Sequence, residues 1–193
     1  RIEEYLNEVK QISLVSSYGN NSYVSAGMEE NYPVQNFLRD DSLRHENEAS
    51  RLFMDNVTMK DRTFSVYLYN LAGGKDLFIS SNKAIDYNYD PRAELWLQSF
   101  IESDQIVTNL STRRDLQTRD GDWAILHVRK VFDLNNGDLL GIVVFSIDIE
   151  FVHKVIERLQ QSNRFAFTVV NEEHQVMYNR DETQIGKPVH EVI

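Results

Sequence analysis

The sequence contains no cysteine, which excludes disulfide bonds, thiolate metal sites and cysteine nucleophiles together. It has only eight glycines, and none of them forms a GxGxxG fingerprint or a P-loop. The five histidines show no HExxH or similar metal-ligand spacing, and no GxSxG motif is present. We therefore expect that this chain is not an enzyme and that it holds neither a cofactor nor a metal.

Basic residues are also scarce, because 20 Lys and Arg stand against 30 Asp and Glu and give a formal charge of −10. This sign opposes nonspecific attraction to nucleic acid, which is not an expected partner. The longest apolar run, Leu139 to Phe145, is far shorter than the roughly 20 residues that span a bilayer. Because the chain starts at Arg1 and its last segment has no closing element, we expect a fragment whose membrane anchor lies outside it.

The first 60 residues carry a helical pattern. Apolar residues recur at three- and four-residue spacings from Ile2 to Ile12, which predicts an amphipathic helix. The pattern resumes after Pro33, which suits a first helical turn, and continues to Val57. We expect this region to be mostly helical and to consist of more than one piece.

The period changes to two at Thr63, which predicts a strand up to Tyr69 and a hairpin partner over 76–80. A polar segment, 81–91, then leads to a short helix over 93–101. The following loop, 111–120, mixes three arginines with two aspartates and is expected to be a solvated loop of mixed charge.

Two further strands are expected over 123–132 and 139–149, joined by a turn at Asn136-Gly137. A helix over 151–160 and a new hairpin from Phe165 to Tyr178 complete the chain. This order of elements is typical of an α+β fold with an antiparallel sheet.

Three segments resemble motifs of Cache domains, the PAS-like extracytoplasmic sensor modules of bacterial receptors. The sequence DPRAELWL, from Asp90 to Leu97, resembles the DPRxRxWY segment of the family, and LGIVVFSIDI, from Leu140 to Ile149, resembles its LGVvxxDI strand. The stretch from Phe165 to Gly186 resembles the opening of the second lobe of a double Cache domain. The first helices are similar to those of histidine kinases that pair with AraC-type regulators in Gram-positive bacteria.

The resemblance implies a PAS-like antiparallel sheet flanked by a long N-terminal helix, with the start of a second lobe at the C-terminus. It divides the chain into a helical stalk (1–60), a membrane-distal Cache lobe (61–150), a connecting helix (151–163) and a truncated second lobe (164–193). Amino-acid-binding members have Arg two residues before the Trp and Tyr after it, whereas this chain has Glu94 and Leu97. The resemblance therefore favours a neutral polar ligand such as a carbohydrate.

Strand parity selects the candidate ligand-binding residues, because alternate residues of a strand point to opposite faces of the sheet. We expect the aliphatic face of the first strand to meet the long helix and the other face of the sheet to line a pocket. The expected pocket residues combine aromatic surface with both signs of charge, as small-molecule sites do. They are Tyr67, Tyr69, Trp96, His127, Arg129 and Asp148.

Each of these residues also has a structural interpretation. The tyrosines suit any strand, Trp96 suits a packed anchor, and Asp148 suits a cap for the helix expected after it. His127 and Arg129 suit structural ion pairs with nearby acids.

The leading interpretation is the extracellular, ligand-sensing domain of a membrane-bound histidine kinase in a two-component system, with a small polar molecule as its ligand. Homodimerisation through the N-terminal helices is the second expected interaction. Two alternatives stay open. One is an interaction module whose pocket is filled by its own side chains, and the other is the same sensor domain on a chemoreceptor or a cyclic-dinucleotide enzyme. An open cavity beside Trp96 would favour ligand sensing over the first alternative.

Overall fold

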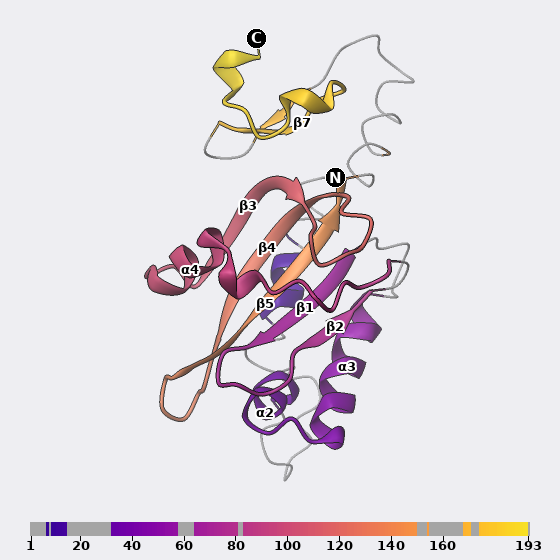
Figure 1. The fold of residues 1–193 in the computed structure, drawn as a ribbon. Helices are drawn as coiled ribbons and strands as arrows, with labels where there is room; N and C mark the ends of the chain where they lie inside the picture. Colours follow the sequence, from indigo (N-terminus) through magenta and orange to yellow (C-terminus); the bar gives the residue numbers. More distant parts are fainter. Residues whose placement is uncertain are drawn as a thin grey trace.

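The computed structural model describes residues 7, 9–14, 32–57, 64–80, 83–149, 154, 168–170 and 174–192. Its centre is an antiparallel five-stranded sheet with the strand order β2-β1-β5-β4-β3 (Figure 1). The strands are β1 (Phe64–Asn70), β2 (Leu77–Ile79), β3 (Val107–Arg114), β4 (Trp123–Phe132) and β5 (Leu139–Asp148). The expected α+β fold with an antiparallel sheet is confirmed.

The helices around this sheet are α2 (Pro33–Arg39), α3 (Leu43–Val57), the 3-10 helix η2 (Pro91–Ala93) and α4 (Leu95–Glu102). A short N-terminal segment, 9–14, is also helical. Near the C-terminus, β6 (Val169–Val170) pairs with β7 (Val176–Tyr178), and the 3-10 helices η3 (Glu182–Gln184) and η4 (Val189–Glu191) follow.

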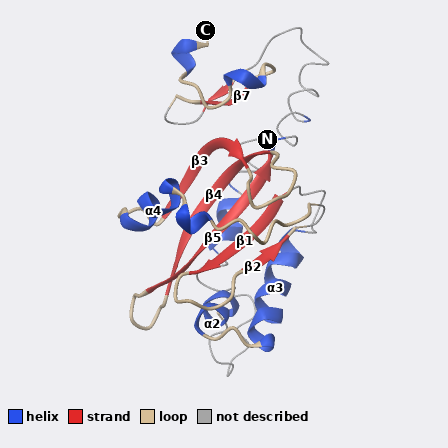
Figure 2. Ribbon diagram, in the orientation of Figure 1, coloured by secondary structure: helices blue, strands red, loops and turns tan. Residues whose placement is uncertain are grey.

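Both faces of the five-stranded sheet are buried. On one face, Phe145 of β5 packs in a single core with Phe37 of α2, Phe53 of α3 and Val9 of the N-terminal segment. On the other face, a second core forms around Leu97 and Phe100 of α4, which Figure 2 shows well separated from α2 and α3. The helices thus divide between two faces, and we call these the α2/α3 face and the α4 face.

Cross-strand register decides which residues share a face, because directly paired residues point the same way. Tyr67 of β1 pairs with Val144 of β5, which pairs with Val128 of β4, and all three lie on the α4 face. Their neighbours in each strand, Val66, Phe145 and His127, are paired in the same manner and lie on the α2/α3 face.

Strand β3 was not expected, since its region was assigned to polar loops. It lies at the edge of the sheet, pairs with β4 alone among the described strands, and carries Thr, Asn, Ser and Arg rather than an apolar run. A strand at the edge of a sheet can carry mostly polar side chains. A search for alternating apolar and polar residues therefore does not detect it.

The C-terminal hairpin lies beyond one end of the sheet, where Figure 1 draws it in yellow. Thr112 of β3 donates a buried hydrogen bond from Oγ1 to the carbonyl oxygen of Met177 in β7, at 2.6 Å. This bond joins the two sheets directly. The helix expected over 151–160 lies outside the described residues apart from Lys154, and the division into four segments stays a prediction.

Candidate functional site

A half-enclosed cavity of about 220 Å³ opens on the α4 face of the sheet, beside Trp96. If a water molecule occupies about 30 Å³, this space holds on the order of seven waters, which suits a small metabolite rather than a drug-sized ligand. Its walls are aromatic and aliphatic, with charged groups of both signs. The side chains that line it include Tyr67, Tyr69, Tyr89, Glu94, Trp96, Arg113, Asp115, Gln117, Leu126 and Val144.

Asp115, which follows β3, is the most buried charged group of this wall, with 3% of its surface exposed. Its Oδ2 accepts a 2.6 Å hydrogen bond from the Tyr67 hydroxyl and another from the Ser146 hydroxyl, and its Oδ1 accepts one from the backbone N–H of Gln117 at 3.1 Å. All three neighbours donate, and a carboxylate can accept all three hydrogen bonds. In the described residues no Lys, Arg or His lies within ion-pair distance of it.

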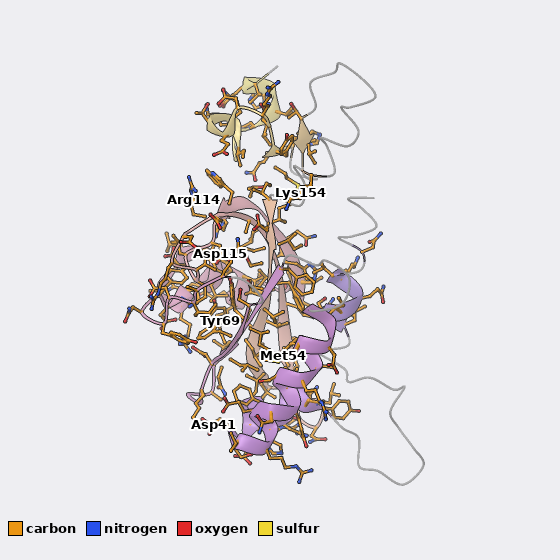
Figure 3. All side chains as sticks on the ribbon, turned by 90° about the vertical axis from the view of Figure 1, so that its right-hand side faces the viewer. Asp41, Met54, Tyr69, Arg114, Asp115 and Lys154 are labelled. Atoms are coloured by element: carbon orange, nitrogen blue, oxygen red, sulfur yellow. The ribbon has the colours of Figure 1, made fainter. Side chains whose placement is uncertain are left out.

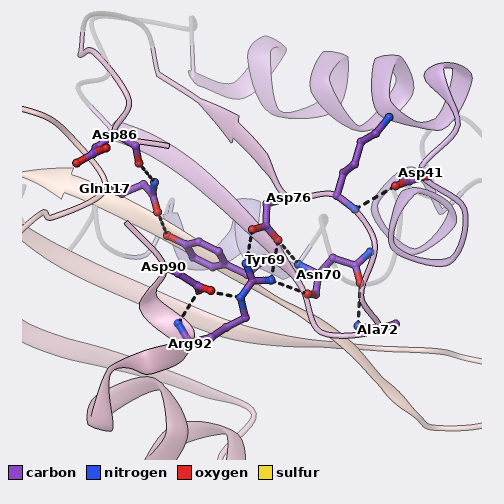
Figure 4. Close-up of polar contacts among 10 residues, drawn as sticks. Asp41, Tyr69, Asn70, Ala72, Asp76, Asp86, Asp90, Arg92 and Gln117 are labelled. Carbon is purple, nitrogen blue, oxygen red and sulfur yellow. Dashed lines mark hydrogen bonds and ion pairs between the residues drawn. The ribbon is translucent and has the colours of Figure 1, made fainter. Parts of the chain in front are cut away.

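The tyrosines of β1 hold this wall in place. Burial and the nearby Asp115 charge raise the pKa of Tyr67 well above its usual value, so its hydroxyl stays a donor. Tyr69 donates to Oε1 of Gln117 at 2.8 Å, and Nε2 of Gln117 donates to the backbone oxygen of Asp86 at 2.6 Å (Figure 4). Figure 3 shows Asp115 and Tyr69 on the side of the sheet away from α3.

Arg113 reaches the same cavity from β3. Its guanidinium carbon lies 5.3 Å from the centroid of the Trp96 ring, which is a cation–π contact. Burial lowers the pKa of Arg113, although the nearby Tyr89 and Glu94 oppose this effect. Its Nε is buried and has no hydrogen-bond partner among the described residues.

A β-bulge explains how Arg113 comes to face the cavity. Leu110 pairs with Leu126, and after an irregularity in β3 Arg113 pairs with Ala124. Residues 110 and 113 are three apart and would face opposite ways in a regular strand, but both oppose β4 residues of the α4 face. The bulge therefore turns Arg113 inward.

The DPR segment fixes the opposite wall. The side chain of Asp90 caps η2 by accepting from the backbone N–H of Arg92 at 3.0 Å. Arg92 then donates to Asp76 at 2.8 Å and to the backbone oxygen of Asn70 at 3.0 Å, as Figure 4 shows. These bonds fasten the start of α4, and with it Trp96, to the β1–β2 hairpin.

The structure brings three of the six expected site residues together at the cavity, namely Tyr67, Tyr69 and Trp96. Their role as ligand contacts stays a prediction.

The other three expected residues lie elsewhere. The ring of His127 contacts Ser13 Oγ at 2.9 Å, and Arg129 Nε donates to the same oxygen at 3.0 Å, so both lie on the α2/α3 face against the N-terminal segment. Asp148 lies beyond the cavity and pairs with Nζ of Lys83 at 2.8 Å. The expectation that these three side chains face the pocket is wrong. His127 and Arg129 are on the residues of β4 that point to the α2/α3 face, and the carboxylate of Asp148 forms an ion pair with Lys83 instead of facing the cavity.

Sequence reasoning missed Arg113, Asp115 and Gln117. All three come from the 111–120 segment, which was interpreted as a solvated loop. The preference for a neutral ligand rested on the absence of Arg at position 94, yet the cavity has a guanidinium from β3 instead. No sequence pattern indicates these three residues, because the facing of Arg113 depends on an irregularity in β3 and Asp115 is held by donors distant in the chain.

Within the described ranges, no three His, Asp or Glu side chains gather closely enough to hold a metal ion. None of the helices in the same ranges combines the length and apolar content that a bilayer crossing requires.

Comparison with known proteins supports the fold. No family model and no curated protein sequence matches the chain. Among solved structures it is similar to the ligand-binding domain of the Pseudomonas fluorescens chemoreceptor CtaA in complex with L-valine, with a TM-score of 0.61, 15% identity and coverage of 98% of this chain and 73% of that one. It is also similar to that of the Pseudomonas aeruginosa chemoreceptor PctC in complex with GABA, with a TM-score of 0.56, 17% identity and coverage of 99% and 73%.

A third similar structure is the ligand-binding domain of the Campylobacter jejuni chemoreceptor Tlp3 in complex with L-norvaline, with a TM-score of 0.58, 12% identity and coverage of 94% and 64%. At these identities the likeness establishes the fold. The expected Cache-type, PAS-like α+β fold is thereby confirmed.

Proposed function

We propose that this chain is a ligand-sensing domain that binds a small, amino-acid-like molecule in the cavity beside Trp96. The observation that carries the proposal is Asp115, a buried carboxylate at the cavity wall whose hydrogen-bond donors are all neutral. A buried charge is stabilised by an opposite charge, and a ligand ammonium group entering the cavity supplies one. Similar solved structures contain L-valine, GABA and L-norvaline, all of which carry an amino group.

An amino-acid-like ligand suits this cavity better than a carbohydrate. A sugar offers only neutral hydroxyl groups, which can hydrogen-bond to Asp115 and Arg113 but bring no opposite charge into this small, partly desolvated space. A ligand with an ammonium group and a carboxylate matches both signs.

A thermal-shift screen tests this proposal. The panel contains the twenty L-amino acids, GABA, common mono- and disaccharides and small organic acids, each at millimolar concentration. We expect one or more amino acids or GABA to raise the midpoint of thermal unfolding and the sugars to leave it unchanged, because a ligand that binds only the folded state stabilises it. Stabilisation by sugars alone would overturn the choice of ligand class.

The same screen addresses the alternative of an interaction module whose pocket is filled by its own side chains. That alternative requires a closed apolar core beside Trp96, where the described residues leave about 220 Å³ of open space. If no compound of the panel stabilises the wild-type protein, the interaction module becomes the better account.

The output of the sensor is a separate proposal. We propose that the domain forms the extracellular part of a membrane receptor whose remaining segments anchor it and carry the signal. The motifs of the first helices favour a histidine kinase, and the solved structures favour a chemoreceptor. The sequence encoded on either side of residues 1–193 discriminates between them, because a kinase core and a chemoreceptor signalling helix differ plainly.

A further inference from the structure

Arg113 has an N–H group, at Nε, that makes no hydrogen bond to any described residue. Arginine carries five N–H donors in a planar fork, and a buried donor without a partner costs free energy. In the described part of the chain, Arg113 lines the cavity, and its Nε is buried and makes no hydrogen bond. The same guanidinium has no carboxylate within ion-pair distance there. The N–H therefore lacks an acceptor and the guanidinium lacks a counter-charge, and an anion would supply both.

The surroundings of Arg113 fix the direction from which an anion can approach. The guanidinium carbon lies over the Trp96 ring, 5.3 Å from its centroid, so the indole occupies one side of the group and a further partner must approach from another side. Glu94 lies near enough for its charge to affect Arg113. Burial together with Glu94 raises the pKa of Tyr89 to about 12, so the Tyr89 hydroxyl remains neutral. Glu94 lines the same cavity but forms no ion pair with Arg113 among the described residues, so it competes only weakly with a ligand anion for the guanidinium.

We infer that Arg113 is the anion-binding residue of this cavity and that it selects ligands carrying a carboxylate. A carboxylate accepts two parallel hydrogen bonds from Nε and one Nη of an arginine, and this geometry uses the donor that is otherwise unsatisfied. The inference rests on the proposed function, because it assigns the second end of an amino-acid-like ligand. It places the carboxylate against β3 rather than against the segment that contains Glu94.

The experiment compares binding of an acid and its amide by calorimetry. The probes are the L-amino acid that gives the largest stabilisation in the screen and the carboxamide of that same amino acid, which keeps the ammonium group. Wild type, Arg113→Gln, Arg113→Lys and Arg119→Gln are titrated with both. Arg119 is an exposed arginine of the loop that follows β3 and provides the matched control.

For the wild type we expect the carboxamide to bind about 10- to 100-fold more weakly than the acid, as charge-assisted hydrogen bonds imply. Arg113→Gln should weaken binding of the acid by a similar factor and leave the affinity for the carboxamide nearly unchanged. Arg113→Lys should recover only part of the affinity, because lysine lacks the Nε–H and the fork. Arg119→Gln should bind like wild type.

Equal binding of acid and amide, or unchanged affinity in a folded Arg113→Gln protein, overturns the inference while the proposed function stands. If no amino acid binds at all, the proposed function fails, and sodium acetate then tests the anion site by itself. If acetate shifts the Arg113 ¹⁵Nε–¹H resonance and leaves that of Arg119 unchanged, Arg113 still binds anions, and the ligand is a carboxylate other than an amino acid. No shift overturns it as well.

Discussion

The hydroxyl of Tyr67 donates a 2.6 Å hydrogen bond to Oδ2 of Asp115, although 48 residues separate them in the chain. The bond crosses from β1, near the middle of the sheet, to the end of the edge strand β3. It orients the carboxylate at the cavity wall, and it ties the position of the 115–118 loop to the rigid interior of the sheet. The site therefore depends on tertiary structure rather than on one local motif.

Asp148 provides a first prediction, since sequence reasoning assigned it to the ligand. It pairs with Nζ of Lys83 at 2.8 Å, and Lys83 also contacts Asp122 at 3.0 Å. We expect Asp148→Asn to lower the free energy of unfolding by about 1–3 kcal/mol, because a largely buried ion pair loses one partner. Ligand affinity should stay within about twofold of wild type, since a change below 0.4 kcal/mol is expected away from the site.

Chemical denaturation and calorimetry of the same protein check both parts of this prediction. Asp120→Asn, at an exposed position of the neighbouring loop, is the control. A large loss of affinity in a stable Asp148→Asn protein would return this residue to the binding site.

His127 provides a pH-dependent prediction. The ring is buried between Asn109, which lies 2.7 Å from Nδ1, and Ser13. Burial, with the positive charges of Arg129 and Lys10, lowers the pKa of His127 from 6.5 to about 4. Between pH 6.5 and about pH 4, His127 is protonated in the unfolded chain but stays neutral in the folded protein. The free energy of unfolding therefore falls as the pH drops through this range.

At pH 5 this effect amounts to about 2 kcal/mol relative to pH 7, from roughly 1.4 kcal/mol for each pH unit. We expect His127→Gln to lose about that much less stability than wild type over the same interval, because glutamine does not titrate. Urea denaturation of both proteins at pH 7 and pH 5 measures the difference. Equal losses in the two proteins would mean that His127 is not the group responsible.

The contact between the two sheets provides another prediction. Thr112 Oγ1 donates to the Met177 carbonyl oxygen, and the bond is buried. Thr112→Val keeps the shape of the side chain but leaves that carbonyl unsatisfied, at a cost of about 1–3 kcal/mol. Hydrogen exchange should become faster for the amides of β7, whereas those of β1 and β5 should be unaffected.

Thr183→Val, at an exposed position in η3, should leave the exchange of β7 unchanged. If Thr112→Val has equally little effect on β7, the bond to Met177 does not hold the two sheets together.

Much of the fold could be predicted from the sequence, because β1, β4 and β5 carry strong apolar patterns and the β4–β5 turn contains Gly137 at a φ of 79°. The face of each strand was harder to assign. Parity within β1 placed Tyr67 and Tyr69 together, but parity alone does not relate β1 to β4. The observed register pairs Val66, Phe145 and His127 across the sheet, and sequence patterns do not contain that register.

The charged part of the candidate site was beyond sequence analysis for a different reason. Arg113 faces the cavity only because a bulge shifts the parity of β3 between Leu110 and Arg113. Asp115 is buried only because Tyr67 and Ser146, distant in the chain, donate to it. Arginine and aspartate in one polar segment usually indicate solvent, and tertiary contacts reverse that expectation here.

The central claim is that Asp115 binds the ammonium group of an amino-acid-like ligand. The most direct test is a calorimetric titration of wild type and Asp115→Asn with the L-amino acid that gives the largest thermal shift. The asparagine oxygen can keep the hydrogen bonds from Tyr67 and Ser146 and loses only the one from the Gln117 N–H, so the fold should survive. Asp120→Asn serves as the exposed control. We expect Asp115→Asn to weaken binding at least about 30-fold, or 2 kcal/mol, because a desolvated charge pair is lost. Unchanged affinity in a folded Asp115→Asn protein would contradict the account.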